Sequence, residues 1–587
     1  MDAKQFLAEF GHIANAPGGV ARLREMVLAL AVQGKLLAQD PTDSLENELL
    51  KGISSGNHDV LRNSKSKLPK TLTTISPNEM PFEKPQGWEW ARLGDIAEIE
   101  RGGSPRPIDD FLTNDPDGLN WIKIGDTVKG SKFITSTREK IKKEGLVKTR
   151  MVYPGDFLLT NSMSFGRPYI TTIEGCIHDG WLRIHPPSCL EKDYLYHLLS
   201  SPIVANFFLK AAAGAVVQNL NADKVRELPI PLPPLAEQSR IVTKVDELMA
   251  LCDKLELQQQ QRRNLQNNLR QSTLQAVGAS TSPHELQLAW TFLEENFSRL
   301  FQVPEDINEF IANLKDLAVL GLLAKVTSDQ SDLTEIISAC STLRSEYVSS
   351  GLMRKQKLIL NVEHVELNYP EHWAVIPFDE VAVVIGGVTK GRDLRGKDVV
   401  TCPYLSVANV QRGFFKLDQL KTIQITKAEL TKYQVLEGDL LITEGGDWDK
   451  VGRTAIWKGG IDNCLHQNHV FKARVPSERL LNEWVELIFN SGIGRNYFAG
   501  ASKQTTNLAS INMTQLRSFP LPIPPLAEQR NILKNLDVMT AFCQSWRNQL
   551  EHKQKLAALF ATAVTSSFTG ITTEPEENEP LKAPKPN

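Results

Sequence analysis

Two stretches of the chain carry apolar residues at the spacing of a long amphipathic helix. In the first stretch, apolar residues separated by four and three positions are Ile241, Val245, Leu248, Cys252 and Leu255. The second stretch repeats this spacing at Ile532, Leu536, Met539, Cys543, Trp546 and Leu550. Such a period places one apolar seam along a helix, as in a coiled coil. Each stretch continues for 43 residues without a proline, which predicts two helices of roughly 64 Å.

The same phrase, PPLAEQ, opens both helices, at Pro233 and at Pro524. Proline lacks an amide donor and holds an extended backbone, so it ends the preceding segment and stiffens the start of the helix. Glu237 and Glu528 fall in the first turn, where a negative charge suits the helix dipole. We interpret the phrase as the junction between a folded domain and a long helix.

The phrase belongs to an internal duplication that covers most of the chain. VYPGDFLLT around Gly155 is repeated as VLEGDLLIT around Gly438, and Trp88 has its counterpart in Trp373. The offset between the copies drifts only from 283 to 291 residues, so their order is kept. A weaker match relates LALAVQGKLL near the N-terminus to KDLAVLGLLA in the middle of the chain. Each copy therefore consists of a short helical segment, a linker, a domain and a long helix.

The repeat predicts the order of the domains. The fold class that we expect is α+β, with two α/β domains in an approximate twofold arrangement, joined by two long antiparallel coiled-coil helices. The predicted segments are an N-terminal helical segment (1–53), a linker (54–85), a first domain (86–234), a long helix (235–280), a central helical region (281–365), a second domain (366–525), a second long helix (526–570) and a disordered tail (571–587).

Composition excludes several classes of protein. Hydrophobic residues make up 41% of the 587 residues and the formal net charge is -3, so charge alone argues neither for nor against nucleic acid. Seven scattered cysteines favour free thiols in a reducing cytosol over a disulfide framework or a zinc site. The N-terminus lacks the apolar core of a signal peptide, and no apolar run reaches the roughly 20 residues of a membrane span. We expect a cytoplasmic protein.

Motifs for catalysis are missing from the sequence. GGVTKGRD at Gly386 lacks the Lys-Ser/Thr of a phosphate-binding loop, and HPPS at His185 is only a distant match to the [ND]PP[YF] of amino-group methyltransferases. Neither HExxH nor GxSxG occurs. His178 and His466 repeat beside cysteines, but a packed or hydrogen-bonded role suits them better than metal binding. We therefore predict neither catalytic nor metal-binding residues.

Basic residues and polar, glycine-rich loops are the candidates for function. From 120 to 150 there are nine basic residues against three acidic ones, which suits phosphate contact but also an ordinary solvated face. TNSMSFGRP and TEGGDWDKVGR occupy equivalent places after predicted strands, and so do AAAGAVVQNLN and AGASKQTTNLA. Their side chains are of the types that read base edges, with Asn and Gln suited to adenine and Lys and Arg to guanine. Two equivalent frames with divergent contents would read two different short sequences.

We expect DNA contacts from both domains. In the first domain the candidates are Lys123, Lys129, Lys132, Asn161, Ser162, Ser164, Arg167, Gln218 and Asn219. In the second domain they are Lys390, Arg392, Arg395, Lys450, Arg453, Lys503, Gln504 and Asn507. Arg167 and Arg453 have an alternative role inside their own domains, tied to a carboxylate.

The chain resembles a known family. Two diverged domains, each closed by [LF]PxPxPPLAEQ and a long helix, are similar to the specificity subunit (HsdS) of type I restriction-modification enzymes. The N-terminal segment APGGVARLREMVLALAVQGKL and the extended middle resemble the longer type IB subclass. The resemblance implies two target-recognition domains that each bind one half of a bipartite double-stranded DNA site. It also implies that the helices hold these domains apart over an unread spacer.

The resemblance further implies a division of labour. Two methyltransferase (HsdM) subunits would bind S-adenosylmethionine and methylate adenine N6, and translocating nuclease (HsdR) subunits, with ATP and Mg, would complete the complex. This chain would be non-catalytic, without a cofactor of its own, in a bacterial or archaeal cytoplasm. Docking and the helix seam would involve Leu235, Glu237, Gln238, Ile241, Val245, Leu248, Leu526, Glu528, Gln529, Ile532, Leu536 and Met539. A self-contained methyltransferase or nuclease, or a protein-binding scaffold without a DNA role, are the alternatives.

Overall fold

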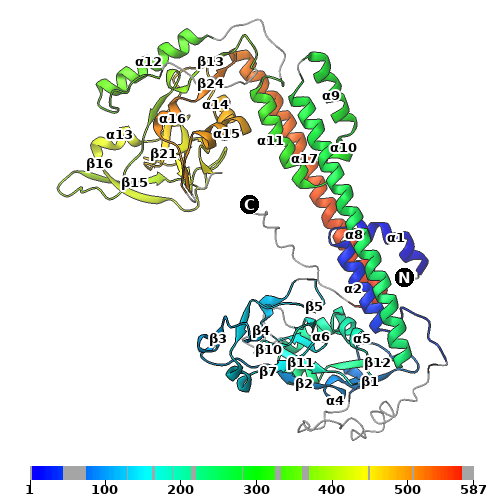
Figure 1. Ribbon diagram of the computed structural model, residues 1–587. Coiled ribbons are helices and arrows are strands. Elements are labelled where there is room, and N and C mark those ends of the chain that lie inside the picture. The colour runs from blue at the N-terminus through cyan, green and yellow to red at the C-terminus, as the bar shows by residue number, and fades with distance from the viewer. Residues whose placement is uncertain are drawn as a thin grey trace. The chain divides into compact units, whose positions relative to one another are not determined.

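The computed structural model forms two compact units (Figure 1). Unit 1 comprises residues 1–263 and 553–587, and unit 2 comprises residues 264–552. The residues that the structure describes are 3–41, 43, 75–128, 130–161, 166–187, 189–212, 220–280, 282–323, 332–359, 369–446, 450–505 and 508–571. The predicted tail from 572 onwards and most of the predicted linker lie outside these residues.

The domain of unit 1 contains two five-stranded sheets. The strands of the main sheet, in spatial order, are β2 (Glu98–Arg101), β11 (Trp181–His185), β8 (Phe157–Thr160), β9 (Pro168–Thr171) and β5 (Phe133–Ile134). The second sheet contains β3 (Leu112–Thr113), β6 (Glu139–Ile141), β4 (Leu119–Ile122), β10 (Gly175–Ile177) and β7 (Arg150–Val152). The short helices are α4 (Leu93–Ile96), α5 (Lys192–Leu199), α6 (Pro202–Ala212) and α7 (Ala222–Arg226). Strands β8 and β9 are fully buried, in agreement with their unbroken apolar sequence.

The domain of unit 2 repeats the main sheet in shorter form. Its strands are β14 (Val383–Ile385), β21 (Val470–Arg474), β17 (Leu440–Thr443) and β19 (Thr454–Ile456). A second sheet contains β16 (Lys421–Thr426), β15 (Val399–Leu405) and β20 (Leu465–His466), and a third contains β18 (Gly445–Gly446), β23 (Leu508–Ser510) and β22 (Lys503–Thr505). The helices are α13 (Leu430–Tyr433), α14 (Asn482–Asn490), α15 (Gly492–Ala501) and α16 (Met513–Arg517).

Each domain is closed by a two-stranded antiparallel sheet that ends at the repeated phrase. β12 (Pro229–Leu232) pairs with β1 (Glu89–Arg92), and β24 (Pro520–Ile523) pairs with β13 (Ala374–Pro377). Prolines alternate along β12 and β24, which suits strands at a sheet edge. The chain then enters α8 (Leu235–Gly278) or α17 (Leu526–Thr569) directly. The first strand and the last strand of each domain therefore meet where its long helix begins.

Three helical segments pack together in unit 1. They are α2 (Gly19–Val32), the first part of α8 and the last part of α17. Helix α1 (Ala3–Asn15) precedes α2. Arg24 of α2 lies 2.6 Å from Asp253 and 2.7 Å from Glu256, both on α8. Cys252 of α8 shares an apolar cluster with α2 and with Ala561 of α17. The two long helices therefore meet antiparallel in this unit.

Unit 2 repeats this arrangement with the roles of the long helices exchanged. Here α11 (Pro304–Val319), preceded by α9 (Pro283–Glu295) and α10 (Phe297–Leu300), packs with the first part of α17 and the last part of α8. Arg270 of α8 lies 2.7 Å from both Asp306 and Glu309 of the α11 segment. Trp546 of α17 donates to the Phe301 carbonyl at 3.3 Å. A further helix, α12 (Leu333–Ser349), packs on the edge strand β14.

A glycine after α2 and after α11 confirms that the weaker sequence match is part of the repeat. Gly34 has φ 66° and Gly321 has φ 79°. A Cβ atom on Gly34 would lie 3.0 Å from the Trp88 ring, and one on Gly321 would lie 3.0 Å from the Trp373 ring. Only glycine combines this backbone conformation with so close an approach.

The predicted fold class is confirmed: the chain is α+β, with two sheet-containing domains and two long helices. The seam prediction was incomplete, because a heptad pattern does not identify the partner of its apolar face. Ile241 and Val245 pack into the domain core of unit 1 rather than against α17. Leu235, also assigned to the seam, is 42% exposed. In each unit a third helix, α2 or α11, completes the packing that a two-helix coiled coil was expected to provide.

Candidate nucleic-acid interface

The two predicted loop regions of each domain are held together by the same backbone hydrogen bonds. In the first domain, the N–H of Thr160 bonds the Arg167 carbonyl at 3.0 Å, and the N–H of Gly166 bonds the Thr160 carbonyl at 2.7 Å. The next residue, Asn161, donates its N–H to Gly180 at 2.9 Å and accepts from Leu220 at 2.9 Å. Asn161 therefore connects the strand β8 to the segment that follows the second loop.

The second domain has the same set of backbone hydrogen bonds, which we call the loop frame. Thr443 bonds the Arg453 carbonyl and Gly452 bonds the Thr443 carbonyl, both at 3.0 Å. Glu444 donates its N–H to His469 at 3.0 Å and accepts from Ile511 at 2.9 Å. The Thr160 and Thr443 hydroxyls also accept the amides of Arg167 and Arg453, each at 3.0 Å. The frame is shared, whereas the side chains that it presents differ.

A polar cluster surrounds Asn161 in the first domain. The Asn161 amide donates to the Asp179 carbonyl at 2.9 Å, and Arg101 donates to the same carbonyl at 3.0 Å. The Asp179 carboxylate accepts from Ser104 at 2.8 Å and lies 3.0 Å from His178. Arg101 and Asp179 were not among the predicted site residues, and nothing in their local sequence distinguishes them.

Several predicted basic residues of the first domain are paired inside the domain. Lys123 lies 2.5 Å from Glu139, and Lys132 lies 2.5 Å from Asp193. Arg167 is exposed beside the frame. Exposed lysines that already have a carboxylate partner contribute less net positive charge to a phosphate contact. The charge count of this segment therefore overestimated its basic surface.

The predicted basic residues of the second domain are also partly paired. Arg392 lies 2.5 Å from Glu429, and Arg395, 90% exposed, lies 2.9 Å from Asp393. Lys390 is exposed and lies over the Tyr404 ring, 4.9 Å from its centre. The half-buried Lys450 and Arg453 lie at the end of the first loop, and Arg453 donates to Gln411 at 2.9 Å. The structural role for Arg453 was expected to involve a carboxylate, but this partner is an amide.

Other predicted contacts cannot be placed. Outside the described residues lie Lys129, Ser162, Ser164, Gln218, Asn219 and Asn507. Lys503 and Gln504 belong to the backbone of β22, which pairs with β23, and β23 pairs with β18 (Gly445–Gly446) at the start of the first loop. In the second domain the two loop regions therefore share one small sheet.

Comparison with known proteins identifies the family. The family described as "Type I restriction modification DNA specificity domain" matches residues 85–263 and 370–555, more than half of the chain. The chain belongs to this family. Each of the two matched segments contains one domain and the beginning of one long helix, so the internal duplication corresponds to two copies of the specificity domain.

Two specificity subunits from Escherichia coli match this specificity subunit over nearly its whole length. The EcoEI specificity subunit is 26% identical over 574 residues and the EcoAI specificity subunit is 26% identical over 568 residues, with 94% of each chain covered in both cases. The crystal structure of an HsdS subunit from Thermoanaerobacter tengcongensis covers 84% of this chain and 98% of its own, at 17% identity and a TM-score of 0.37. That structural similarity is too low to support an argument.

The repeated Glu-Gln pair anchors each long helix of the specificity subunit to its own domain. Glu237 accepts the Trp88 indole N–H at 2.9 Å, and Glu528 accepts that of Trp373 at 3.1 Å. Gln238, 1% exposed, accepts from the Glu191 amide at 2.8 Å and donates to the carbonyls of Cys189 (2.9 Å) and Pro233 (3.0 Å).

The second copy repeats these bonds. Gln529, 0% exposed, accepts from the Leu481 amide at 2.9 Å and donates to the carbonyls of Arg479 (3.0 Å) and Pro524 (2.8 Å). The four residues that were expected to take part in docking or the helix seam, Glu237, Gln238, Glu528 and Gln529, are all buried against their own domains. The helix-dipole interpretation did not predict these bonds.

The two repeated histidines differ in burial, because His466 is fully buried whereas the side chain of His178 is 38% exposed. Burial lowers the pKa of His178, with an opposing effect from the Asp179 carboxylate. Burial, together with the charge of Lys472, lowers the pKa of His466 to about 3. Burial also lowers the pKa of Lys472 itself to about 8, and its ammonium group donates to the carbonyls of Lys432 and Gln434.

No cluster of three or more His, Cys, Asp or Glu side chains that could hold a metal ion occurs within the described ranges. Of the helices in that part of the chain, none is long and apolar enough to cross a membrane.

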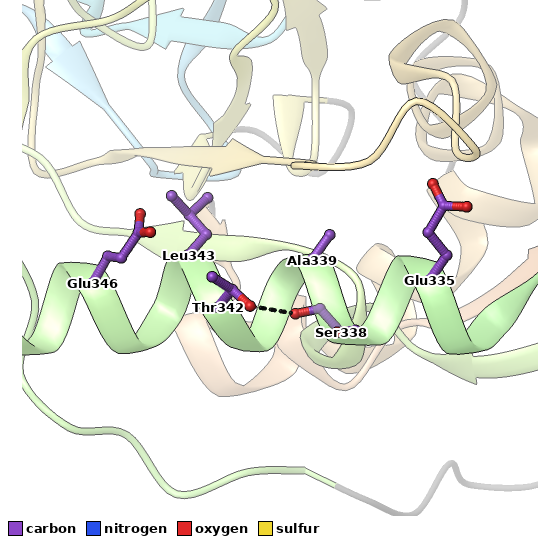
Figure 2. A pocket seen from close by; sticks show the side chains of 6 residues that line it. All are labelled: Glu335, Ser338, Ala339, Thr342, Leu343 and Glu346. Atoms are coloured by element: carbon purple, nitrogen blue, oxygen red, sulfur yellow. Dashed lines mark hydrogen bonds between the residues drawn. The ribbon is translucent and has the colours of Figure 1, made fainter.

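An open hollow of about 440 Å³ lies along α12 and is lined by Glu335, Ser338, Ala339, Thr342, Leu343 and Glu346 (Figure 2). Its two charged residues are acidic, so this hollow does not suit a phosphate group.

Proposed function

We propose that each specificity domain binds one half of a bipartite double-stranded DNA target. The observation that carries this proposal is the pair of identical loop frames, which hold Asn161 in one domain and Glu444 in the other. A shared frame keeps the position of the reading side chain, while different side chains give different base preferences. Two unlike half-sites are the expected result.

The long helices set the unread spacer between the half-sites. The anchors at Gln238 and Gln529 fix each helix to its own domain through buried hydrogen bonds. Because α8 begins in unit 1 and ends in unit 2, and α17 does the reverse, both helices connect the two readers. The length of these two continuous helices would then set the length of the spacer.

The same helices dock the methyltransferase subunits. Exposed large apolar residues lie along them in both units: Leu251, Leu257, Leu556, Leu559 and Phe560 in unit 1, and Leu265, Leu269, Val538 and Phe542 in unit 2. Large apolar side chains gathered on exposed helix faces are typical of interaction surfaces. Because such residues occur in both units, they suit two copies of one partner, the HsdM-type methyltransferase subunit.

This chain supplies recognition and the partner subunits supply chemistry. S-adenosylmethionine belongs to the methyltransferase subunits, and ATP and Mg belong to the HsdR-type nuclease subunits of the complete complex. The site described above supports this division, because its polar side chains are the types that bind phosphates and base edges. Recognition and catalysis are then separated between chains.

The experiment that tests the proposal combines the purified chain with its methyltransferase subunits and S-adenosylmethionine. We expect methylated adenines in one split sequence with a constant spacer, and no methyl transfer by the chain alone. Methyl transfer by the purified chain alone would contradict the proposal. For docking, Leu265→Ser should weaken association with the methyltransferase subunit, whereas Gln271→Ser, also exposed on α8, should not.

A further inference from the structure

Asn161 and Glu444 occupy one structural position in two different domains. Each follows the last residue of a central strand, β8 or β17. Each donates its backbone N–H to the turn before β11 or β21, and each accepts the N–H that follows the second loop. Backbone bonds on both sides fix the Cα position, so that only the side chain is free to differ.

The Asn161 side chain has an acceptor without a donor. Its Nδ2 donates to the Asp179 carbonyl at 2.9 Å. Asn161 is only 3% exposed, and its Oδ1 is buried. This oxygen nevertheless has no hydrogen-bond partner among the described residues. A buried carbonyl oxygen without a donor carries a desolvation cost, which a donor on a ligand would remove.

The Glu444 side chain also presents acceptor oxygens. His469 Nδ1 lies 2.8 Å from Glu444 Oε2, and the carboxylate is 29% exposed. A carboxylate has about four acceptor positions, so one contact from His469 leaves acceptors available. Sequence comparison of TNSMSFGRP with TEGGDWDKVGR aligns Glu444 with Asn161, but only the hydrogen-bond frame shows that the two backbones coincide.

We propose that Asn161 and Glu444 are the equivalent base-reading positions of the two domains. Each accepts a hydrogen bond from an exocyclic amino group, N6 of adenine or N4 of cytosine, in the major groove. Guanine and thymine present O6 and O4 acceptors at the same place, and these would face the side-chain oxygen without a proton between them. This assignment rests on the proposed function and adds the residue and the class of base read in each half-site.

The test uses the full chain with its methyltransferase subunits and duplexes in which each half-site position is varied in turn. Glu444→Gln keeps the size of the side chain but adds an amide donor, so the position should also accept guanine or thymine. We expect discrimination at one base pair of one half-site to fall roughly ten- to a hundredfold. Asn161→Leu removes the acceptor and should relax one base pair of the other half-site only.

Asp398→Asn is the matched control, since Asp398 is exposed in the same domain and pairs with the exposed Lys427. We expect it to leave both half-sites unchanged. If the variant of the buried Asn161 lowers the unfolding temperature, the variant of the half-buried Glu444 still decides the outcome. Discrimination within twofold of the wild type at every base pair for Glu444→Gln would overturn the assignment. A wild-type complex that marks no split sequence would instead contradict the proposed function.

Discussion

Removal of one buried glutamine should loosen a long helix from its domain. Gln529→Met keeps the length of the side chain but removes its hydrogen bonds. The change leaves the Leu481 amide without its acceptor and the Arg479 and Pro524 carbonyls without their donor. Because the side chain is 0% exposed, water cannot replace these bonds without opening the junction.

The three lost bonds set the size of the effect. A buried hydrogen bond of this kind contributes about 1 kcal/mol net, and an unsatisfied buried group costs about 1–3 kcal/mol. The junction should therefore lose about 3 kcal/mol, which corresponds to a roughly hundredfold higher population of its open form. Gln238→Met removes the same three bonds in unit 1 and should have an effect of the same size there.

Hydrogen exchange measured by mass spectrometry on the full chain can detect this opening. In Gln529→Met the peptide that carries the Leu481 amide should exchange about a hundredfold faster, while the Glu191 peptide in unit 1 keeps its wild-type rate. Gln544→Met is the control, because the Gln544 side chain on the same helix donates to exposed Asn548 at 3.1 Å. Equal exchange at Leu481 in the Gln529 and Gln544 variants would refute the anchor.

Three further predictions concern the interior and the helices. Burial lowers the pKa of His466 to about 3 in the folded chain. As the pH falls from 6.5 to 3, His466 therefore takes up a proton in the unfolded chain but not in the folded chain. The wild type should lose up to about 1.4 kcal/mol per pH unit relative to His466→Asn, as urea titrations at several pH values would show. Asp379→Asn removes the buried carboxylate that pairs with the half-buried Arg344 and the buried Arg517, so the unfolding midpoint should fall by the equivalent of about 3 kcal/mol, whereas the exposed Asp393→Asn should not change it. Four residues inserted after both Arg263 and His552, at the boundary of the units, add roughly 6 Å of helix. At about 3.4 Å per base pair, adenine-methylation mapping should show a spacer longer by one or two base pairs and unchanged half-sites. Altered half-sites with the old spacer would contradict the proposal that the long helices set the spacer.

The long helices were predictable from sequence because apolar period and absence of proline act locally. Observed α8 and α17 begin at Leu235 and Leu526, directly after the repeated prolines. The partners of those helices were not predictable, because the same apolar face can pack on a sheet, on α2 or on the other long helix. Val245 illustrates this: its heptad position predicts a helix seam, yet it lies in the domain core.

The loop regions could be located from the repeat, but the partners of their charged side chains could not be predicted from it. Sequence alignment identified the loops because the strands before them and the Gly-Arg after them are shared. It could not show that Lys123 pairs with Glu139 of the same basic segment, or that Lys132 pairs with the distant Asp193. It also gave no reason to choose Glu444 from among its acidic neighbours. Long-range pairing decides which charges remain available, and pairing is a property of the fold.

The anchors explain how two domains can diverge while their frame persists. All three bonds of Gln238 go to backbone atoms, and so do all three bonds of Gln529. The loop frame around Asn161 and Glu444 is likewise built from backbone amides and carbonyls. Backbone groups are present whatever the side chain, so substitutions that alter base preference leave both the helix junction and the frame intact. The same chemistry that fixes the position of each reader therefore leaves its specificity free to change.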